Sequence, residues 1–247
     1  MNTERYAIYY APPPRSALWK YGCRWLGWDA YSGERMPLRV PRGLDEADYL
    51  AMVETPRKYG FHATLKAPFH LHPDRSVDEL VEGLGLLASS HKQIVLPKLV
   101  LTSLDGFMAL RPEEPNSELD NLAADCVVQL DRFRAPLSEV QIAKRRQSDL
   151  TEEQDTNLLR WGYPYVLDQY RFHMTLTGRL QESQRMQVQS ILKREMEPLL
   201  SEPHTIDSLT LFRQAAEDQP FYAIMRFSLV PVSPDESLER DSIASAN

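Results

Sequence analysis

Two short stretches of this sequence decide the fold: YGFHATL at residues 59–65 and YRFHMTL at residues 170–176. They agree at five of seven positions and lie 111 residues apart. In each stretch apolar and polar residues alternate, which is typical of a strand with one buried face. Histidine and threonine therefore share the face that points away from the apolar side chains. A repeated pattern of this kind predicts two similar lobes.

Each stretch belongs to the first of four elements that occur in the same order in both halves of the chain. A strand, a helix and two further strands are predicted at 59–68, 76–90, 94–101 and 107–111, and again at 169–177, 182–200, 205–212 and 221–230. A strand at 5–11 precedes the first set, and helices at 117–133 and 152–161 precede the second. We expect an α+β fold with two pseudo-symmetric lobes, each an antiparallel sheet with helices on its outer face, around a central cleft.

Residues 1–232 are expected to form a single bilobal domain, with lobes of roughly 1–115 and 116–232. The remaining segment, 233–247, is polar, rich in serine and acidic, and is expected to be a disordered tail. The segment 15–57 shows no clear periodicity but contains Trp19, Trp25, Trp28 and Tyr31. These rings form either a local hydrophobic cluster or a surface on which a base or sugar stacks.

Composition excludes some classes of protein. The 247 residues carry a formal charge of −7, so a broad basic surface for a long nucleic acid is not favoured, although nucleic acid is kept as an alternative partner. The first residues contain no apolar targeting segment, and no stretch is long enough to cross a membrane. We expect a cytoplasmic protein with no membrane partner. Cys23 and Cys126 fit no metal or redox motif and are expected to be reduced, buried thiols.

The repeated His-x-Thr pattern points to phosphoester chemistry. Hydrolysis needs one group that takes a proton from water and another that gives a proton to the leaving oxygen, and histidine does both near neutral pH. We expect His62 and His173 to fill these roles with imidazoles about 5–8 Å apart, close enough to flank one phosphate. The hydroxyls of Thr64 and Thr175 are expected to bind its oxygens. Lys66 and Arg171 continue the same alternation and are expected to add positive charge.

Other readings of these residues are weaker. His62, His70 and His72 would suggest a metal site, but no carboxylate stands in a ligand pattern, so no metal and no cofactor is expected. The sequence has no nucleophile elbow, Walker loop or dinucleotide fingerprint. A purely architectural duplication remains the alternative for the repeat. The run 144–146 (KRR) is either a solvated helix face or a contact for a second phosphate.

The paired motifs FHATL (61–65) and FHMTL (172–176) resemble those of the 2H phosphoesterase superfamily. This resemblance implies two α+β lobes around a cleft, with His62 and His173 as the catalytic pair and Thr64 and Thr175 binding phosphate. The superfamily includes 2′,3′-cyclic-nucleotide phosphodiesterases and bacterial RNA 2′,5′-ligase-like proteins. Further stretches (LW at 18–19, WLG at 25–27, RWGYPY at 160–165) resemble a branch encoded beside phosphonate-degradation genes, over residues 5–231.

The function favoured by the sequence is metal-independent hydrolysis of a cyclic phosphodiester on a small, ribose-type substrate. The resemblance to the phosphonate-associated branch suggests a ribosyl 1,2-cyclic phosphate. Two alternatives are an RNA-end 2′,3′-cyclic phosphodiesterase and a non-catalytic module that binds nucleotides or RNA. The sequence leaves open which histidine is the base and which is the acid, and it does not indicate an oligomeric state.

Overall fold

A computed structural model describes residues 4–232. Its main sheet has seven antiparallel strands in the order β11-β10-β1-β4-β8-β7-β6. These strands are β1 (Arg5–Tyr10), β4 (Ala63–Phe69), β6 (Leu99–Leu104), β7 (Phe107–Pro112), β8 (Met174–Arg179), β10 (Ser208–Gln214) and β11 (Tyr222–Ser228). Two small ladders pair β2 (Trp28–Asp29) with β3 (Glu34–Arg35) and β5 (Ile94–Leu96) with β9 (His204–Ile206).

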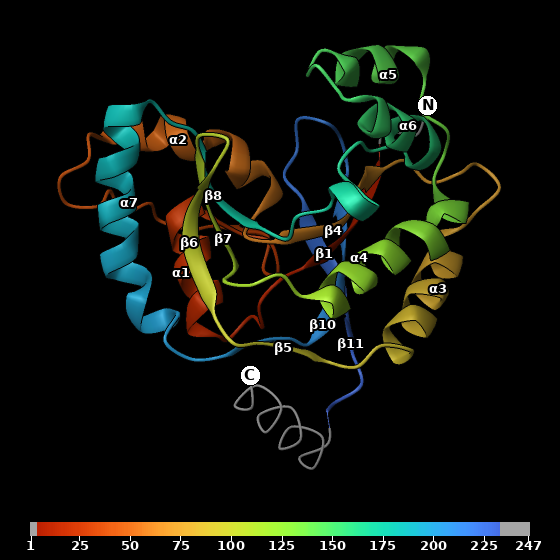
Figure 1. Cartoon of the computed structure of the whole chain (residues 1–247), viewed down its shortest axis with the longest axis horizontal. Coiled ribbons are helices and arrows are strands. Elements are labelled where there is room, and N and C mark those ends of the chain that lie inside the picture. Colours follow the sequence, from red (N-terminus) through yellow and green to blue (C-terminus); the bar gives the residue numbers. More distant parts are fainter. Residues whose placement is uncertain (1–3, 233–247) are drawn as a thin grey trace.

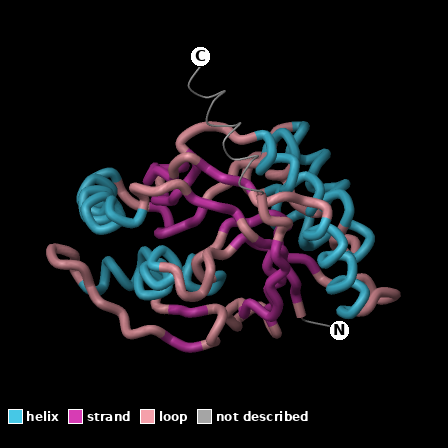
Figure 2. The backbone as a smooth tube through the Cα atoms, turned by 90° about the horizontal axis from the view of Figure 1, so that it is seen from below, coloured by secondary structure: helices cyan, strands magenta, loops and turns pink. Residues whose placement is uncertain are grey.

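The helices lie on the outside of the sheet (Figure 2). They are α1 (Ala17–Leu26), α2 (Glu46–Tyr59), α3 (Val77–Ser89), α4 (Ser117–Gln129), α5 (Glu139–Arg146), α6 (Glu152–Trp161) and α7 (Glu182–Met196). Short 3₁₀ turns are Asp131–Phe133, Leu167–Gln169 and Glu197–Leu199. In Figure 1, α1, α2 and α7 lie on one side of the molecule and α3 and α4 on the other. Each group packs on its own half of the sheet.

The two halves of the sheet meet at one residue pair. The strands β4 and β8 are paired only through Ala63 and Met174. On one side of this junction lie β4, β1, β10 and β11 with α3 and α4; on the other lie β8, β7 and β6 with α1, α2 and α7. The prediction of an α+β fold with two lobes built on antiparallel sheets is therefore confirmed.

The lobes do not follow the order of the sequence. After β4 and α3 the chain leaves its lobe, and β6 and β7 pair beside β8. After β8 and α7 it returns, and β10 and β11 pair on the β1 side of β4. The two crossings run antiparallel to each other as β5 and β9. The expected division into lobes 1–115 and 116–232 is therefore corrected: it separates the two repeats, whereas each lobe takes strands from both.

The segment 15–57 is more regular than its sequence suggested. It contains α1 and most of α2, which periodicity did not reveal. Trp19, Trp25 and Trp28 are at most 5% exposed. The indole of Trp25 donates to the backbone oxygen of Leu176 at 2.8 Å. These rings form part of the core, which confirms the hydrophobic-cluster interpretation over a stacking surface for substrate.

Two other expectations concern the ends and the surroundings of the chain. The predicted tail at 233–247 lies outside the described residues. None of the helices within residues 4–232 combines the length and the apolar character that crossing a bilayer requires.

The close approach of α1 to the start of β4 gives a test of the fold. A Cβ atom on Gly22 would lie 2.2 Å from Cγ of the fully buried Phe61. We expect Gly22→Ala to lower the free energy of unfolding by about 1–3 kcal/mol, because the overlap outweighs the gain in helix propensity. Gly85, in α3, is the matched control: its Cβ would lie 3.8 Å from Phe227. Gly85→Ala should stabilise the protein by about 0.5–1 kcal/mol.

Both variants are compared with the parent by urea denaturation. A Gly22→Ala protein as stable as the parent would show that α1 does not pack against Phe61 this closely.

Candidate active site

The register at the lobe junction places the repeated residues on one face. In an antiparallel ladder, the neighbours of a facing pair also face each other and point to the opposite side of the sheet. Extended by one residue to either side of Ala63 and Met174, this register sets His62, just before β4, opposite Thr175, and His173, just before β8, opposite Thr64. Diagonal neighbours on such a ladder lie about 7–8 Å apart. By this register each histidine lies opposite the threonine of the other repeat.

Cavities in the cleft agree with this arrangement. A cavity of about 350 Å³ is lined by His62 and Thr175, and one of about 520 Å³ by Thr64 and His173. Phe107 and Arg179 line both. The two volumes therefore adjoin, and the four residues of the repeated motif surround one cleft.

The ring of His62 is fixed from three sides. Its Nδ1 lies 3.0 Å from the backbone oxygen of Gly60, and its Nε2 lies 3.3 Å from Oγ1 of Thr64. A carbonyl oxygen only accepts, so in the neutral ring Nδ1 carries the proton and Nε2 is the free base. The ring also stacks on Tyr9 from β1, with centroids 3.8 Å apart. Gly60 caps α2 with φ 77°, a conformation that favours glycine.

The second histidine is held in the same way. Nδ1 of His173 lies 2.8 Å from the backbone oxygen of Arg171, which again leaves Nε2 as the free base. The ring centroid lies 5.6 Å from that of Phe107 on β7. Each histidine is therefore oriented by the carbonyl two residues before it and by an aromatic ring from the next strand of its own half of the sheet.

The surroundings keep both rings neutral in the free protein. Burial lowers the pKa of His62 to about 4, and the nearby His173 lowers this pKa further against the opposing effect of the Gly60 carbonyl. Burial also lowers the pKa of His173 below its ordinary value, while the carbonyl of Arg171 and the carboxylate of Asp105 act in the opposite direction. At neutral pH, two unprotonated Nε2 atoms therefore face the cleft.

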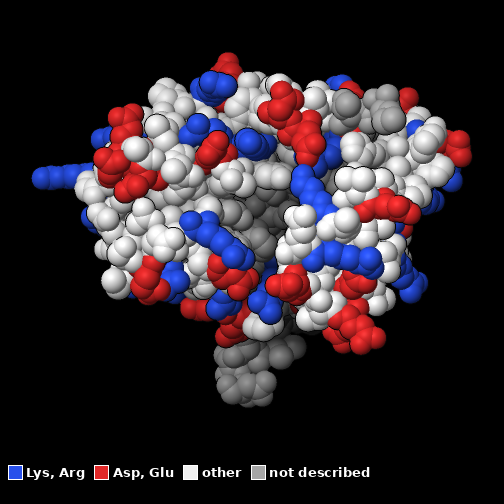
Figure 3. Space-filling view, turned by 90° about the horizontal axis from the view of Figure 1, so that it is seen from above, with Lys and Arg blue, Asp and Glu red and all other residues white. Residues whose placement is uncertain are grey.

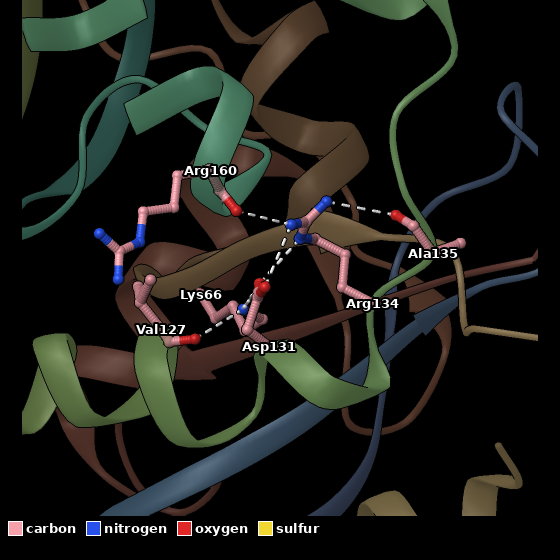
Figure 4. A network of polar contacts seen from close by, with 6 residues as sticks. All are labelled: Lys66, Val127, Asp131, Arg134, Ala135 and Arg160. Atoms are coloured by element: carbon pink, nitrogen blue, oxygen red, sulfur yellow. Dashed lines mark hydrogen bonds and ion pairs between the residues drawn. The ribbon is translucent and has the colours of Figure 1, made fainter. Parts of the chain in front are cut away.

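Lys66 does not continue the face of His62 and Thr64. The pairing of β4 with β1 shifts register between Thr64 and Lys66, so simple alternation fails there. The Lys66 ammonium donates to the backbone oxygen of Val127 at 2.9 Å and pairs with Asp131 at 3.2 Å (Figure 4). It lines a neighbouring cavity rather than the two around the histidines. The expectation that Lys66 lies beside the histidines is therefore corrected.

Two arginines stand closer to the histidines. Arg171 is exposed and lines the cavity of His173, in the place that alternation predicted. Arg179 lines both cavities, and sequence reasoning missed it. The alternation that contains His173, Thr175 and Thr177 reaches Arg179 two residues later, so the signal was present. Thr177 itself is committed to the backbone: its hydroxyl accepts from Met108 N and donates to Gly178 O.

The histidines considered as metal ligands do not form a cluster. Within residues 4–232, no group of three or more His, Cys, Asp or Glu side chains is placed to hold a metal ion. His70 contacts the backbone oxygen of Glu4 at 2.8 Å, and His72 accepts from the backbone of Asp74. Cys23 and Cys126 are free and buried, as predicted.

Comparison with known proteins identifies the family. The family described as "Protein of unknown function (DUF1045)" matches residues 64–222, which is more than half of the chain. The chain belongs to this family. The matched segment begins at Thr64 and includes His173 and Thr175, so it contains three of the four residues of the repeated motif.

Two curated relatives are longer proteins. A ribose 1,5-bisphosphate phosphokinase PhnN of Janthinobacterium sp. (strain Marseille) is 36% identical over 225 residues, which is 89% of this chain and 49% of the relative. A protein of the same name from Laribacter hongkongensis is 39% identical over 178 residues, which is 72% of this chain and 41% of the relative. The chain thus spans about half the length of the curated relatives it matches.

Solved structures show more distant likeness. A structure described as a phosphoesterase has a TM-score of 0.41 and 14% sequence identity, with 92% of this chain and 99% of the other covered. E. coli LigT complexed with 3′-AMP gives a TM-score of 0.40 and 14% identity over 92% and 99%.

The protonation of the two histidines is measurable by NMR. In the free protein we expect His62 to stay neutral until the pH falls to about 4, and His173 to titrate below its ordinary value, because burial disfavours the imidazolium. Inorganic phosphate should raise both pKa values, since a bound anion stabilises the protonated ring.

His91 lies outside the cleft, where it pairs with Asp125, and its ring signals should not change when phosphate is added. If His62 titrates at pH 6.5 or above without phosphate, the buried, neutral arrangement is wrong.

Proposed function

We propose that this protein is a metal-independent phosphoesterase that opens a cyclic phosphodiester on a small, ribose-type molecule. One observation supports the proposal: Ala63 pairs with Met174, and the histidine and threonine on either side of this pair line two adjoining cavities. The two-fold arrangement presents a base to either side of a phosphorus atom. This suits attack by water on one side and departure of the leaving oxygen on the other.

The proton transfers follow from the tautomers. Nε2 of one histidine takes a proton from water as the water oxygen bonds to phosphorus. The bond from phosphorus to one ring oxygen of the cyclic ester breaks, and that oxygen takes the proton carried on Nε2 of the other histidine. The product is a phosphomonoester with a free hydroxyl. In the free protein both histidines are neutral. When the negatively charged phosphodiester binds, it stabilises the protonated form of one histidine, which then carries the proton for the leaving oxygen.

The difference between the histidines favours one assignment. His62 lies against Tyr9 and has a pKa of about 4, so it holds a proton poorly at neutral pH and suits the base. His173 has Asp105 nearby to favour its protonated form and suits the acid. Developing charge on the phosphoryl oxygens would be met by the hydroxyls of Thr64 and Thr175 and by the Arg179 guanidinium.

The substrate class is supported by the relatives. Both curated relatives are named for ribose 1,5-bisphosphate. Hydrolysis of a ribosyl 1,2-cyclic phosphate at the bond from phosphorus to O2 leaves the phosphate on O1, one of the two positions phosphorylated in that compound. This chain contains no Walker loop, so nothing in its sequence supports the kinase activity in that name. Ribosyl 1,2-cyclic phosphate is therefore the substrate we propose, in keeping with the phosphonate-associated resemblance.

Substitution of the motif residues tests catalysis. With a cyclic phosphate substrate and EDTA present, His62→Ala and His173→Ala should each lower kcat by about 10²–10⁴-fold, with KM changed little. Thr64→Val and Thr175→Val should cost about 10–10³-fold, because each deletes one donor to a phosphoryl oxygen. His91→Ala is the matched control and should retain full activity.

If neither histidine variant loses turnover, a non-catalytic binding module becomes the better interpretation. If the parent is inactive in EDTA and recovers with zinc or manganese, the metal-independent mechanism is wrong.

The size of the substrate forms a separate prediction. An extended RNA contacts several phosphates, and each contact adds to the salt dependence of binding. The cleft cavities adjoin within a chain of net charge −7, so we expect kcat/KM for small cyclic phosphates to equal or exceed that for RNA ends with the same group. The dependence of kcat/KM on salt should be shallow. A strong preference for the oligonucleotide with a steep salt slope would favour the RNA-end phosphodiesterase instead.

A further inference from the structure

A third cavity adjoins the two that surround the histidines. It has a volume of about 540 Å³ and shares Tyr59 with the cavity of His62, and Ser148 and Tyr163 with the cavity of His173. Lys66, on its wall, follows Thr64 by two residues along β4, with the bulge between them. A molecule held by the histidines and threonines can therefore extend into this space.

The lining of this cavity is strongly cationic. Among residues 4–232, one acidic residue, Glu217, and six Lys and Arg residues line it: Arg5, Lys58, Lys66, Arg134, Lys144 and Arg145. The chain as a whole has a charge of −7, so this density of positive charge is local. Figure 3 shows Lys and Arg side chains around a hollow in the middle of one face.

Two of these cations, Arg134 and Lys66, are held in place by the carboxylate of Asp131. Arg134 makes a two-bond contact with Asp131 at 2.8 and 3.1 Å and also donates to the backbone oxygen of Arg160. Lys66 is 3% exposed and shares the same carboxylate (Figure 4). One carboxylate cannot neutralise two cations, so the pair retains positive charge at the wall of the cavity.

The other cations of α2 and α5 are not held by any buried carboxylate that the structure describes. Within the described part of the chain, neither Lys58 nor Arg145 forms an ion pair with a carboxylate, and Arg145 lies over the ring of Tyr163, 4.9 Å from its centroid. Lys144 reaches only the exposed Glu217, at 3.5 Å. Arg146, next in the helix, instead pairs with Asp155 and does not line the cavity. The basic run is therefore divided between the cavity and the surface.

Part of the wall of this cavity comes from an insertion that is specific to the second repeat. In the first repeat, three residues separate α2 from β4; in the second, α5, α6 and two 3₁₀ turns separate α4 from β8. Figure 1 shows α5 and α6 together at the top of the molecule. This insertion supplies Lys144, Arg145 and Tyr163, and it gives the cavity a volume in the usual range for small ligands.

We propose that this cavity is a second anion subsite, which binds a terminal phosphate of the substrate about one sugar ring from the phosphodiester that is hydrolysed. The inference deepens the proposed function and rests on it for the identity of the first phosphate. The substrate is then a sugar cyclic phosphate that carries another phosphate on its far end, such as the 5-phosphate of a ribosyl 1,2-cyclic phosphate.

The first experiment measures binding without catalysis. By calorimetry with the full chain, ribose 5-phosphate should bind at least 10-fold more tightly than ribose, because the terminal phosphate gains charge-assisted hydrogen bonds. The substitutions Arg145→Gln, in α5, and Lys58→Gln, in α2, should each weaken the binding of ribose 5-phosphate about 10–100-fold. Arg146→Gln is the matched control and should change binding less than twofold. Thermal melts establish that each variant is folded.

The second experiment measures selectivity in turnover. The ratio of kcat/KM for ribosyl 1,2-cyclic phosphate with and without a 5-phosphate should exceed 10 in the parent and in Arg146→Gln, and should fall by about 10-fold or more in Arg145→Gln and Lys58→Gln.

The outcomes separate the two proposals. Tight ribose 5-phosphate binding that depends on Arg145, with no cyclic phosphate hydrolysed, would retain the subsite and overturn the proposed function. Equal turnover of both cyclic phosphates, with ribose 5-phosphate bound no better than ribose, would retain the function and overturn the subsite. Equal effects of Arg145→Gln and Arg146→Gln would also overturn it.

Discussion

The structure depends on one contact, the pairing of Ala63 with Met174. It is the only pairing between β4 and β8 within the described residues, and it joins the two halves of the sheet. Both side chains are completely buried, one small and one large. A slip of one residue would turn His62 or His173 to the opposite face, because side chains alternate along a strand. The faces on which the two histidines and two threonines lie therefore follow from this register.

The two repeats exchange strands, so the Ala63–Met174 contact joins two halves that each contain strands from both repeats. Because β6 and β7 complete the lobe of β8, while β10 and β11 complete the lobe of β4, neither repeat has a sheet of its own. The walls of the cleft consequently come from both repeats. The insertion of α5 and α6 breaks the two-fold symmetry and adds cations to one side of the cleft only. Symmetry thus accounts for the two histidines, and the insertion adds Lys144 and Arg145 to the cations that β1, α2 and β4 already supply to the cavity.

Local sequence features predicted most of the elements and the central residues of the site. The helix at 76–90 begins at Ser76 with a capping box and ends as expected, and the turn at Asp105 and Gly106 joins β6 to β7. Alternation placed His62 and His173 on polar faces, because a half-buried strand can be recognised from a few consecutive residues. It missed α1, although the buried residues of that helix recur at helical spacing from Leu18 to Leu26. It also missed α2, in which the amphipathic pattern is weak and Pro56 stands inside the helix.

The sequence by itself determined two equivalent strands, the types of residue on their polar faces and the two mismatched positions of the repeat. The structure gives those mismatches a reason, since Gly60 adopts a positive φ and Ala63 packs against Met174. Only the tertiary structure decided which strands share a lobe, where the bulge turns Lys66 away, and which basic residues reach a cavity. Alternation and capping are short-range effects, whereas strand order, bulges and cavities arise from packing between residues far apart in the chain.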